Sequence, residues 1–151
     1  MNSPSRPRIM VLVSRFNEAV VEGLLAGARE VLGQAGLDPQ TVPVVAAELI
    51  RQGGVDGIVA LGCVIRGETS HHEHVGREAI GGLVRLAMET GVAIGIGVLT
   101  VESPEQALVR AGLRPDRGGG KEPGDRHRGR EAARACLETV GLLQELRRGN
   151  G

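Results

Sequence analysis

The feature that most constrains this chain is one apolar run, residues 57–65, which reads Gly-Ile-Val-Ala-Leu-Gly-Cys-Val-Ile. An unbroken, partly β-branched run bounded by glycines predicts a strand that is buried on both faces, as in a parallel sheet. Polar residues begin directly after it, where Gly67, Glu68, Thr69 and Ser70 lead into three of the chain's four histidines. Parallel α/β sheets bind ligands at the carboxyl ends of their strands. We therefore expect the functional site in this polar stretch.

Two further apolar runs, residues 8–13 and 92–100, predict two more buried strands. Apolar residues at helical spacing predict helices between and after the strands, over residues 17–36, 44–52, 74–90, 103–112 and 132–146. The alternation of strands and helices predicts an α/β fold, a three-layer α/β/α sandwich with a central parallel sheet and right-handed crossovers. At 151 residues the chain is long enough for one domain, which we assign to residues 1–151.

Two segments depart from regular alternation. Residues 37–45 contain two prolines within five positions, so they leave room for a stub of a second strand at most. Residues 113–130 are rich in glycine, proline and charge, and such a segment cannot bury enough apolar surface to order itself. We interpret the latter as a flexible insertion before the last helix.

Composition excludes several classes of protein. Lys plus Arg and Asp plus Glu both number 18, so no global field attracts nucleic acid or acidic lipid. The apolar runs fall short of the about 18 residues of a membrane span, and the N-terminus does not resemble a signal peptide. The two cysteines, Cys63 and Cys136, form no CxxC pair or disulfide framework. These features predict a cytoplasmic protein without a nucleic-acid or membrane partner.

His71 follows the strand of residues 57–65 at the position where a general acid or base would be displayed. Histidine titrates near neutral pH without special tuning, although a solvated loop histidine is an equally good interpretation. His72 and His74 compete for the same role. The H-H-x-H cluster could hold a metal, but no cysteine accompanies it and only Glu68 and Glu73 are near, so we predict no metal site.

Three other features could bind a ligand. Gly67, Glu68 and Thr69 before a helix could hold phosphate through backbone N–H groups, although many such turns bind nothing. Arg110, near a predicted helix end, could clamp phosphate or could only interact with the helix dipole. Phe16 is the chain's single aromatic residue and follows the first strand, so it could stack on a flat heterocycle instead of joining the core.

Taken together, four motifs resemble the lumazine synthase family of riboflavin biosynthesis. The first is Ser14-Arg15-Phe16-Asn17, and the second is the run from Ala60 to His71, which reads ALGCVIRGETSH. The others are GVLTVE at residues 97–102 with EQA at 105–107, and RAG at residues 110–112. The similarity extends over nearly the whole chain, and it implies a flavodoxin-like strand order.

The resemblance implies condensation of 5-amino-6-(D-ribitylamino)uracil with 3,4-dihydroxy-2-butanone 4-phosphate, without a cofactor or a metal. It implies that His71 and Arg128 are catalytic, with His71 moving protons. Substrate binding would fall to residues at the ends of the strands and to the start of the last helix: Phe16, Asn17, Cys63, Val64, Ile65, Glu68, Thr69, Ile96, Arg110 and Glu131. Phe16 would stack on the pyrimidine, the backbone of residues 63–65 would read its polar edge, and Arg110 would neutralise phosphate held by Glu68 and Thr69.

The resemblance also implies a homo-oligomer, either a pentamer or an icosahedral cage of pentamers, with each active site between two chains and riboflavin synthase as a candidate partner. The chain departs from the family pattern in the second-strand segment, where only residues 41–44 remain of a ribityl-binding stretch. Ile96 replaces a common aromatic residue, and Arg128 corresponds to a lysine, which is not equivalent in its hydrogen bonding. The alternatives are a catalytically impaired shell protein of the same family and, more weakly, binding of nucleic acid or polyphosphate by the basic residues of 113–130.

Overall fold

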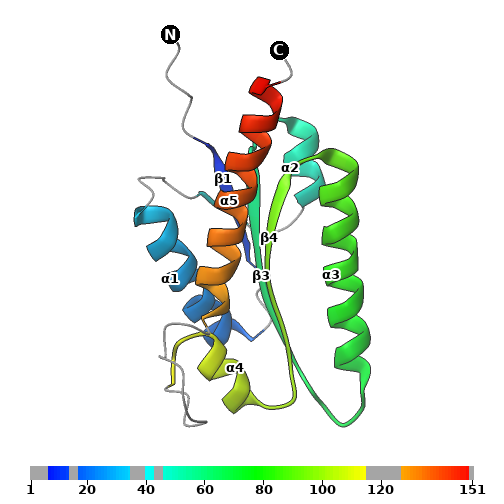
Figure 1. Cartoon of the computed structure of the whole chain (residues 1–151). Helices are drawn as coiled ribbons and strands as arrows, with labels where there is room; N and C mark the ends of the chain where they lie inside the picture. The colour runs from blue at the N-terminus through cyan, green and yellow to red at the C-terminus, as the bar shows by residue number, and fades with distance from the viewer. Residues whose placement is uncertain (1–6, 14–16, 35–39, 43–45, 115–126, 150–151) are drawn as a thin grey trace.

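The computed structural model describes residues 7–13, 17–34, 40–42, 46–114 and 127–149. Four strands and five helices are described in these ranges (Figure 1). In chain order they are β1 Ile9–Val13, α1 Glu18–Gln34, β2 Gln40–Val42, α2 Ala46–Gln52, β3 Gly57–Ile65, α3 His71–Thr90, β4 Ala93–Val101, α4 Pro104–Arg110 and α5 Arg128–Gly149.

The four strands form one parallel sheet in the order β2-β1-β3-β4. Val11 of β1 is paired with Val59 of β3, which is paired in turn with Gly95 of β4. The short strand β2 adds to the outer side of β1, where Met10 is paired with Gln40. The predicted parallel sheet and its flavodoxin-like order are confirmed, and the second strand is a stub of three residues.

Helices cover both faces of the sheet and so complete the predicted three layers. Figure 1 shows α1, α4 and α5 on one side of the sheet, and α2 and α3 on the other. Helix α5 packs on α1 as well as on β3 and β4, while α3 packs mainly on β4. Because all crossovers connect parallel strands, the carboxyl ends of β1, β3 and β4 lie at the same end of the sheet.

The core lies between the sheet and the helices α1 and α5, and it consists of aliphatic side chains and two cysteines. Val11, Leu24, Leu32, Val59 and Cys136 are among its fully buried members. Among the described residues, this core removes apolar surface from water through branched aliphatic side chains that interdigitate closely.

The glycines of β4 let α5 approach the sheet. A Cβ on Gly95 would lie 2.0 Å from the carbonyl oxygen of Ala132, and a Cβ on Gly97 would lie 2.6 Å from Leu61. Glycine within a strand commonly marks a place where another backbone or a ligand approaches closely. At Gly95 the neighbour is the backbone of α5.

The starts of two helices were predicted too late. Helix α3 begins at His71 instead of near residue 74, so the histidine cluster belongs to its first turn. Helix α5 begins at Arg128 instead of residue 132, so residues 128–130 are helical and not part of a flexible insertion. Polar residues in a first helical turn carry no apolar periodicity, which is why the pattern started late in both cases. Residues 115–126 lie outside the described part.

The predicted start of α4 and the predicted end of α3 agree with the structure to within one residue. Ser103 caps α4, its Oγ accepting a hydrogen bond from the backbone N–H of Gln106 at 3.3 Å, and Pro104 follows it. Gly91 ends α3 with a φ of 67°, a left-handed conformation that glycine adopts without steric cost. None of the described helices is long and apolar enough to cross a membrane.

Candidate active site

Asn17 connects the loop after β1 to the strand β3. Its side-chain Nδ2 donates a hydrogen bond of 2.8 Å to the carbonyl oxygen of Cys63. Its φ of 56° is left-handed, a conformation that asparagine tolerates better than most residues. The side-chain amide is thus directed to β3, while the backbone oxygen of Asn17 accepts from the N–H groups of Val20 and Val21 at the start of α1. Phe16 lies outside the described residues.

A cavity of about 850 Å³ opens at the carboxyl ends of β1 and β3, under the first half of α3. We call it the imidazole cavity, and its lining includes Cys63, Val64, Ile65, Thr69 and His71. The walls are mostly aliphatic, with a few polar groups at the start of α3. This composition is typical of a pocket for a small organic ligand. Five of the predicted site residues are therefore brought together.

The start of α3 contributes the polar end of the imidazole cavity. Thr69 Oγ1 accepts a hydrogen bond of 3.4 Å from the backbone N–H of His71, the first residue of the helix. The helix is 20 residues long, and its N-terminus favours an anion through its dipole and its N–H groups. Glu68, in contrast, is exposed and is not among the described residues that line the cavity.

A second cavity, of about 450 Å³, lies beside the edge strand β4. We call it the guanidinium cavity, and its lining includes Ile96, Arg110 and Arg128. Arg110 ends α4 and Arg128 begins α5, so two helix ends bring two cations to one side of the sheet. Val98 lines both cavities, but none of the predicted site residues lines both.

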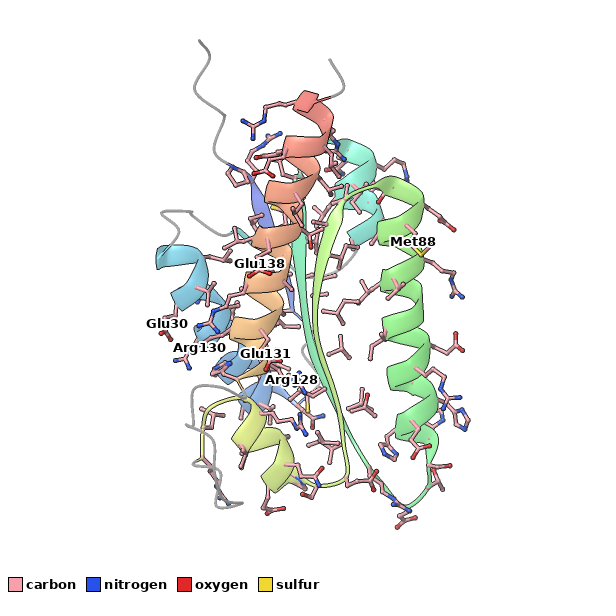
Figure 2. The ribbon with its side chains drawn as sticks, viewed as in Figure 1. Glu30, Met88, Arg128, Arg130, Glu131 and Glu138 are labelled. Atoms are coloured by element: carbon pink, nitrogen blue, oxygen red, sulfur yellow. The ribbon has the colours of Figure 1, made fainter. Side chains whose placement is uncertain are left out.

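Glu131 reaches the guanidinium cavity only through Arg128. The Arg128 guanidinium donates a hydrogen bond from Nη1 to Glu131 Oε2, one helical turn along α5. Figure 2 shows the two side chains close together near the start of α5. Glu131 thus holds Arg128 by a charged hydrogen bond instead of lining the cavity itself.

Sequence reasoning missed a charged cluster next to the imidazole cavity. Glu102 follows β4; its Oε2 accepts a hydrogen bond of 2.7 Å from Arg66 Nη1, and its Oε1 lies 3.3 Å from His72 Nε2. The hydrogen bond from Arg66, and then that from His72, hold the pKa of the Glu102 carboxyl below its ordinary value, and burial opposes them. The same carboxylate raises the pKa of Arg66.

The buried position of His72 could have been found from periodicity. Val75 is the first apolar residue of the pattern in α3, but it is 42% exposed, whereas His72 and Gly76 are buried. Residues 72, 76, 79 and 83 have the helical spacing of one face, so extending the stripe backwards by one turn would have included His72.

His71 and His72 both line the imidazole cavity, but of the clustered histidines only His72 lies among carboxylates. The donor atoms of His72, Glu73 and Glu102 lie within 4.8 Å of one another in the described part of the chain, and His71 and His74 are not in this group. Both Glu102 oxygens already interact with Arg66 and His72, so we interpret the cluster as an ion-pair network.

Comparison with known proteins connects this geometry to a family. The family model described as 6,7-dimethyl-8-ribityllumazine synthase matches residues 6–144. The chain belongs to this lumazine synthase family. The predicted family is therefore confirmed, and the enzyme it implies is a transferase of riboflavin biosynthesis.

Several curated lumazine synthases are similar over most of their length. A 6,7-dimethyl-8-ribityllumazine synthase of Kineococcus radiotolerans is 44% identical, over 91% of this chain and 85% of its own. 6,7-Dimethyl-8-ribityllumazine synthase 1 of Caulobacter vibrioides is 39% identical, over 97% of both chains. The enzyme of Nitratidesulfovibrio vulgaris strain DP4 is 38% identical, over 92% of this chain and 90% of its own.

Proposed function

We propose that this chain condenses 5-amino-6-(D-ribitylamino)uracil with 3,4-dihydroxy-2-butanone 4-phosphate to 6,7-dimethyl-8-ribityllumazine. The observation that carries the proposal is the imidazole cavity, where a titratable side chain, a helix N-terminus and the end of β3 face one space. Condensation of an amine with a carbonyl needs a group that exchanges protons near neutral pH, and a phosphorylated substrate needs an anion site.

Within this cavity, we assign proton transfer to His71 and phosphate binding to Thr69 and the first turn of α3. The imidazole of His71 is exposed, so it can reach a bound substrate without displacing protein. The backbone at residues 63–65 would read the polar edge of the pyrimidine, and Asn17 would keep that edge in place through Cys63. We assign stacking on the pyrimidine ring to Phe16, because this aromatic residue follows β1 in the sequence.

We further propose that each active site combines the imidazole cavity of one chain with the guanidinium cavity of a neighbour. The support is that Arg110 and Arg128 line a different cavity from His71, at a strand that pairs only with β3 in the described sheet. Arginine binds phosphate bidentately, so a neighbour's Arg110 would neutralise the leaving phosphate, and Arg128 would assist the chemistry. Ile96 would complete the ring-binding wall.

The test for activity is incubation of the purified protein with both substrates, followed by fluorescence of the lumazine product. We expect turnover that falls at least about tenfold in His71→Gln, since a positioned acid–base group typically contributes 10²- to 10⁴-fold. A wild-type rate equal to the uncatalysed background would reject the proposal. A large particle without turnover would favour the alternative of an impaired shell protein.

The test for a shared site is co-expression of two inactive variants, His71→Ala and Arg110→Ala. If neighbours in a ring share each site head to tail, random mixing rebuilds intact sites at about a quarter of positions, and activity returns to about that fraction. As a control, His71→Ala is co-expressed with the double variant His71→Ala/Arg110→Ala, which can rebuild no site. Absence of recovery in the first mixture, despite proven co-assembly, would place the site within one chain.

We propose that the assembly is a pentamer or a cage of pentamers. Helix α3 exposes Val84 and Met88, which lie one helical turn apart, and Met88 is 81% exposed (Figure 2), so this helix offers apolar surface for a neighbouring chain. Light scattering and electron microscopy distinguish the two assemblies, and a monomer at micromolar concentration would contradict both.

We also propose a cytoplasmic location, where the two buried free cysteines stay reduced. We propose riboflavin synthase as a partner, to be tested by co-sedimentation.

A further inference from the structure

Arg66, Glu102 and His72 join three segments that are distant in the sequence. Arg66 lies in the turn after β3, Glu102 follows the last residue of β4, and His72 belongs to the first turn of α3. The contacts are Arg66 Nη1 to Glu102 Oε2 at 2.7 Å and His72 Nε2 to Glu102 Oε1 at 3.3 Å. The Glu102 carboxylate therefore connects the end of β3, which lines the imidazole cavity, to helix α3, which carries His71.

The backbone around this carboxylate is also fixed. The N–H of Arg66 donates to the carbonyl of Val101 at 2.9 Å, and the N–H of Glu102 donates to Gln106 Oε1 at 3.0 Å. Gln106 belongs to α4, whose start is capped by Ser103. The position of the Glu102 carboxylate is thus determined by β3, β4 and α4 together, so it is a defined point to which α3 can attach.

Because His72 is the next residue after His71, its contact determines how α3 is rotated. Successive side chains in an α-helix diverge by about 100°, so fixing one side chain against the protein fixes the direction of its neighbour. The side chain of His72 is only 3% exposed, and His71 at the adjacent position is exposed on the imidazole cavity. Rotation of the first turn would move both residues together.

The chemistry of the contact is directional. An ionised carboxylate only accepts hydrogen bonds, so His72 Nε2 must carry the proton in its contact with Glu102. The other ring nitrogen, Nδ1, is buried and has no hydrogen-bond partner among the described residues. An apolar side chain would fill this space without an unpaired nitrogen, so packing alone does not explain a histidine here.

We propose that Glu102 and His72 are positioning residues, which orient the first turn of α3 so that the His71 imidazole faces the substrate. This inference rests on the proposed role of His71 as the proton-transfer group. Misplacement of a reacting group by about 1 Å can cost about 100-fold in rate. Because His72 also lines the imidazole cavity, the test must separate an effect on the rate of the chemical step from an effect on substrate binding.

The kinetic test compares three variants of the full-length enzyme. His72→Leu removes the contact, and we expect kcat to fall about 10- to 100-fold with KM changed less than about threefold. His72→Gln restores a side-chain N–H donor, and we expect it to recover most of the lost kcat. His74→Leu removes an exposed histidine two residues further along that lies outside the cavity lining, so kcat stays unchanged. Equal losses in His72→Leu and His72→Gln would overturn the inference.

If His72→Leu does not fold, the variant Glu102→Gln tests the positioning role instead. Glu102 is half exposed at its side chain, so this change leaves the core intact while it removes the charge that both partners need. We expect kcat to fall about tenfold with KM nearly constant. An unchanged kcat in Glu102→Gln would contradict a positioning role.

A spectroscopic measurement separates this inference from the proposed function. Long-range ¹H–¹⁵N spectra of the imidazoles should show the Nε2 proton of His72, and Glu102→Gln should shift the ring signals of both His72 and His71, whereas His74→Leu should leave His71 unchanged. Absent turnover together with these shifts would reject the function but retain the network. Active enzyme with unshifted His71 signals and unchanged kcat would reject the positioning role alone.

Discussion

Arg130 and Glu30 join the last helix to the first across 100 residues of sequence. Both Nε and Nη2 of Arg130 donate to Glu30 Oε2, at 3.0 and 2.6 Å (Figure 2). Helices α1 and α5 pack against each other over the same face of the sheet. The Arg130–Glu30 pair therefore helps to fix the position of α5 relative to α1 at the surface, above the buried aliphatic core.

We expect Glu30→Gln to lower the free energy of unfolding by about 0.5–1 kcal/mol, because the side chains are 26% and 48% exposed and solvent screens the pair. The loss should shrink in 1 M salt. Urea unfolding at low and high salt measures both effects. Glu138→Gln is the matched control, since Glu138 is exposed on α5 and makes no ion pair within the described residues. Equal losses in the two variants would show that only net charge matters.

Gly27 in α1 should not tolerate alanine. A Cβ there would lie 2.0 Å from Cε1 of His127, whose side chain is buried beside α1. Although alanine favours helices, we expect Gly27→Ala to lower the free energy of unfolding by about 1–3 kcal/mol through overpacking.

The matched control for Gly27→Ala is Gly141→Ala in α5, where no atom lies within 4 Å of the added Cβ. Helix propensity alone should then act, and we expect a gain of about 0.5–1 kcal/mol. Thermal or urea unfolding measures both variants. A stabilised Gly27→Ala would mean that the imidazole of His127 can leave its site at little cost.

His127 should make stability depend on pH. Burial, and then the charge of Arg130, lower its pKa below the ordinary 6.5 in the folded state. The unfolded chain therefore binds this proton more readily, and stability rises with pH in that range. The contribution is complete above about pH 6.5 and is lost as the pH falls through the folded-state pKa. In His127→Gln, the slope of unfolding free energy between about pH 6.5 and 5 should flatten. An unchanged slope would contradict this origin.

The two cysteine thiols should be unreactive in the native protein. Burial raises the pKa of Cys63 and of Cys136 from 9.0 to about 11. At pH 8 the thiolate fraction is then about 100-fold lower than for an exposed thiol, and access is restricted as well. We expect a disulfide reagent to label both thiols at least about 100-fold more slowly in buffer than in guanidinium. Rapid labelling of Cys136 in the native protein would indicate that the core opens frequently, whereas Cys63 also lines the imidazole cavity.

Much of the site could be predicted because its residues follow one strand. Thr69 and His71 come directly after β3, and strand ends in a parallel sheet are displayed at one edge, so local order along the chain determines their place. Glu68 illustrates the limit, because it is adjacent to Thr69 in sequence but is exposed outside the cavity lining.

The sequence by itself determined the strands β1, β3 and β4, most helix ends and the chemical groups at the strand ends, because periodicity, glycines and caps act over a few residues. Only the tertiary structure decided which distant side chains meet. The sheet order places Glu102 against His72 and Arg66, and the packing of α5 on α1 places Arg130 against Glu30. Such pairings depend on the register and layering of whole elements, and no local pattern encodes these.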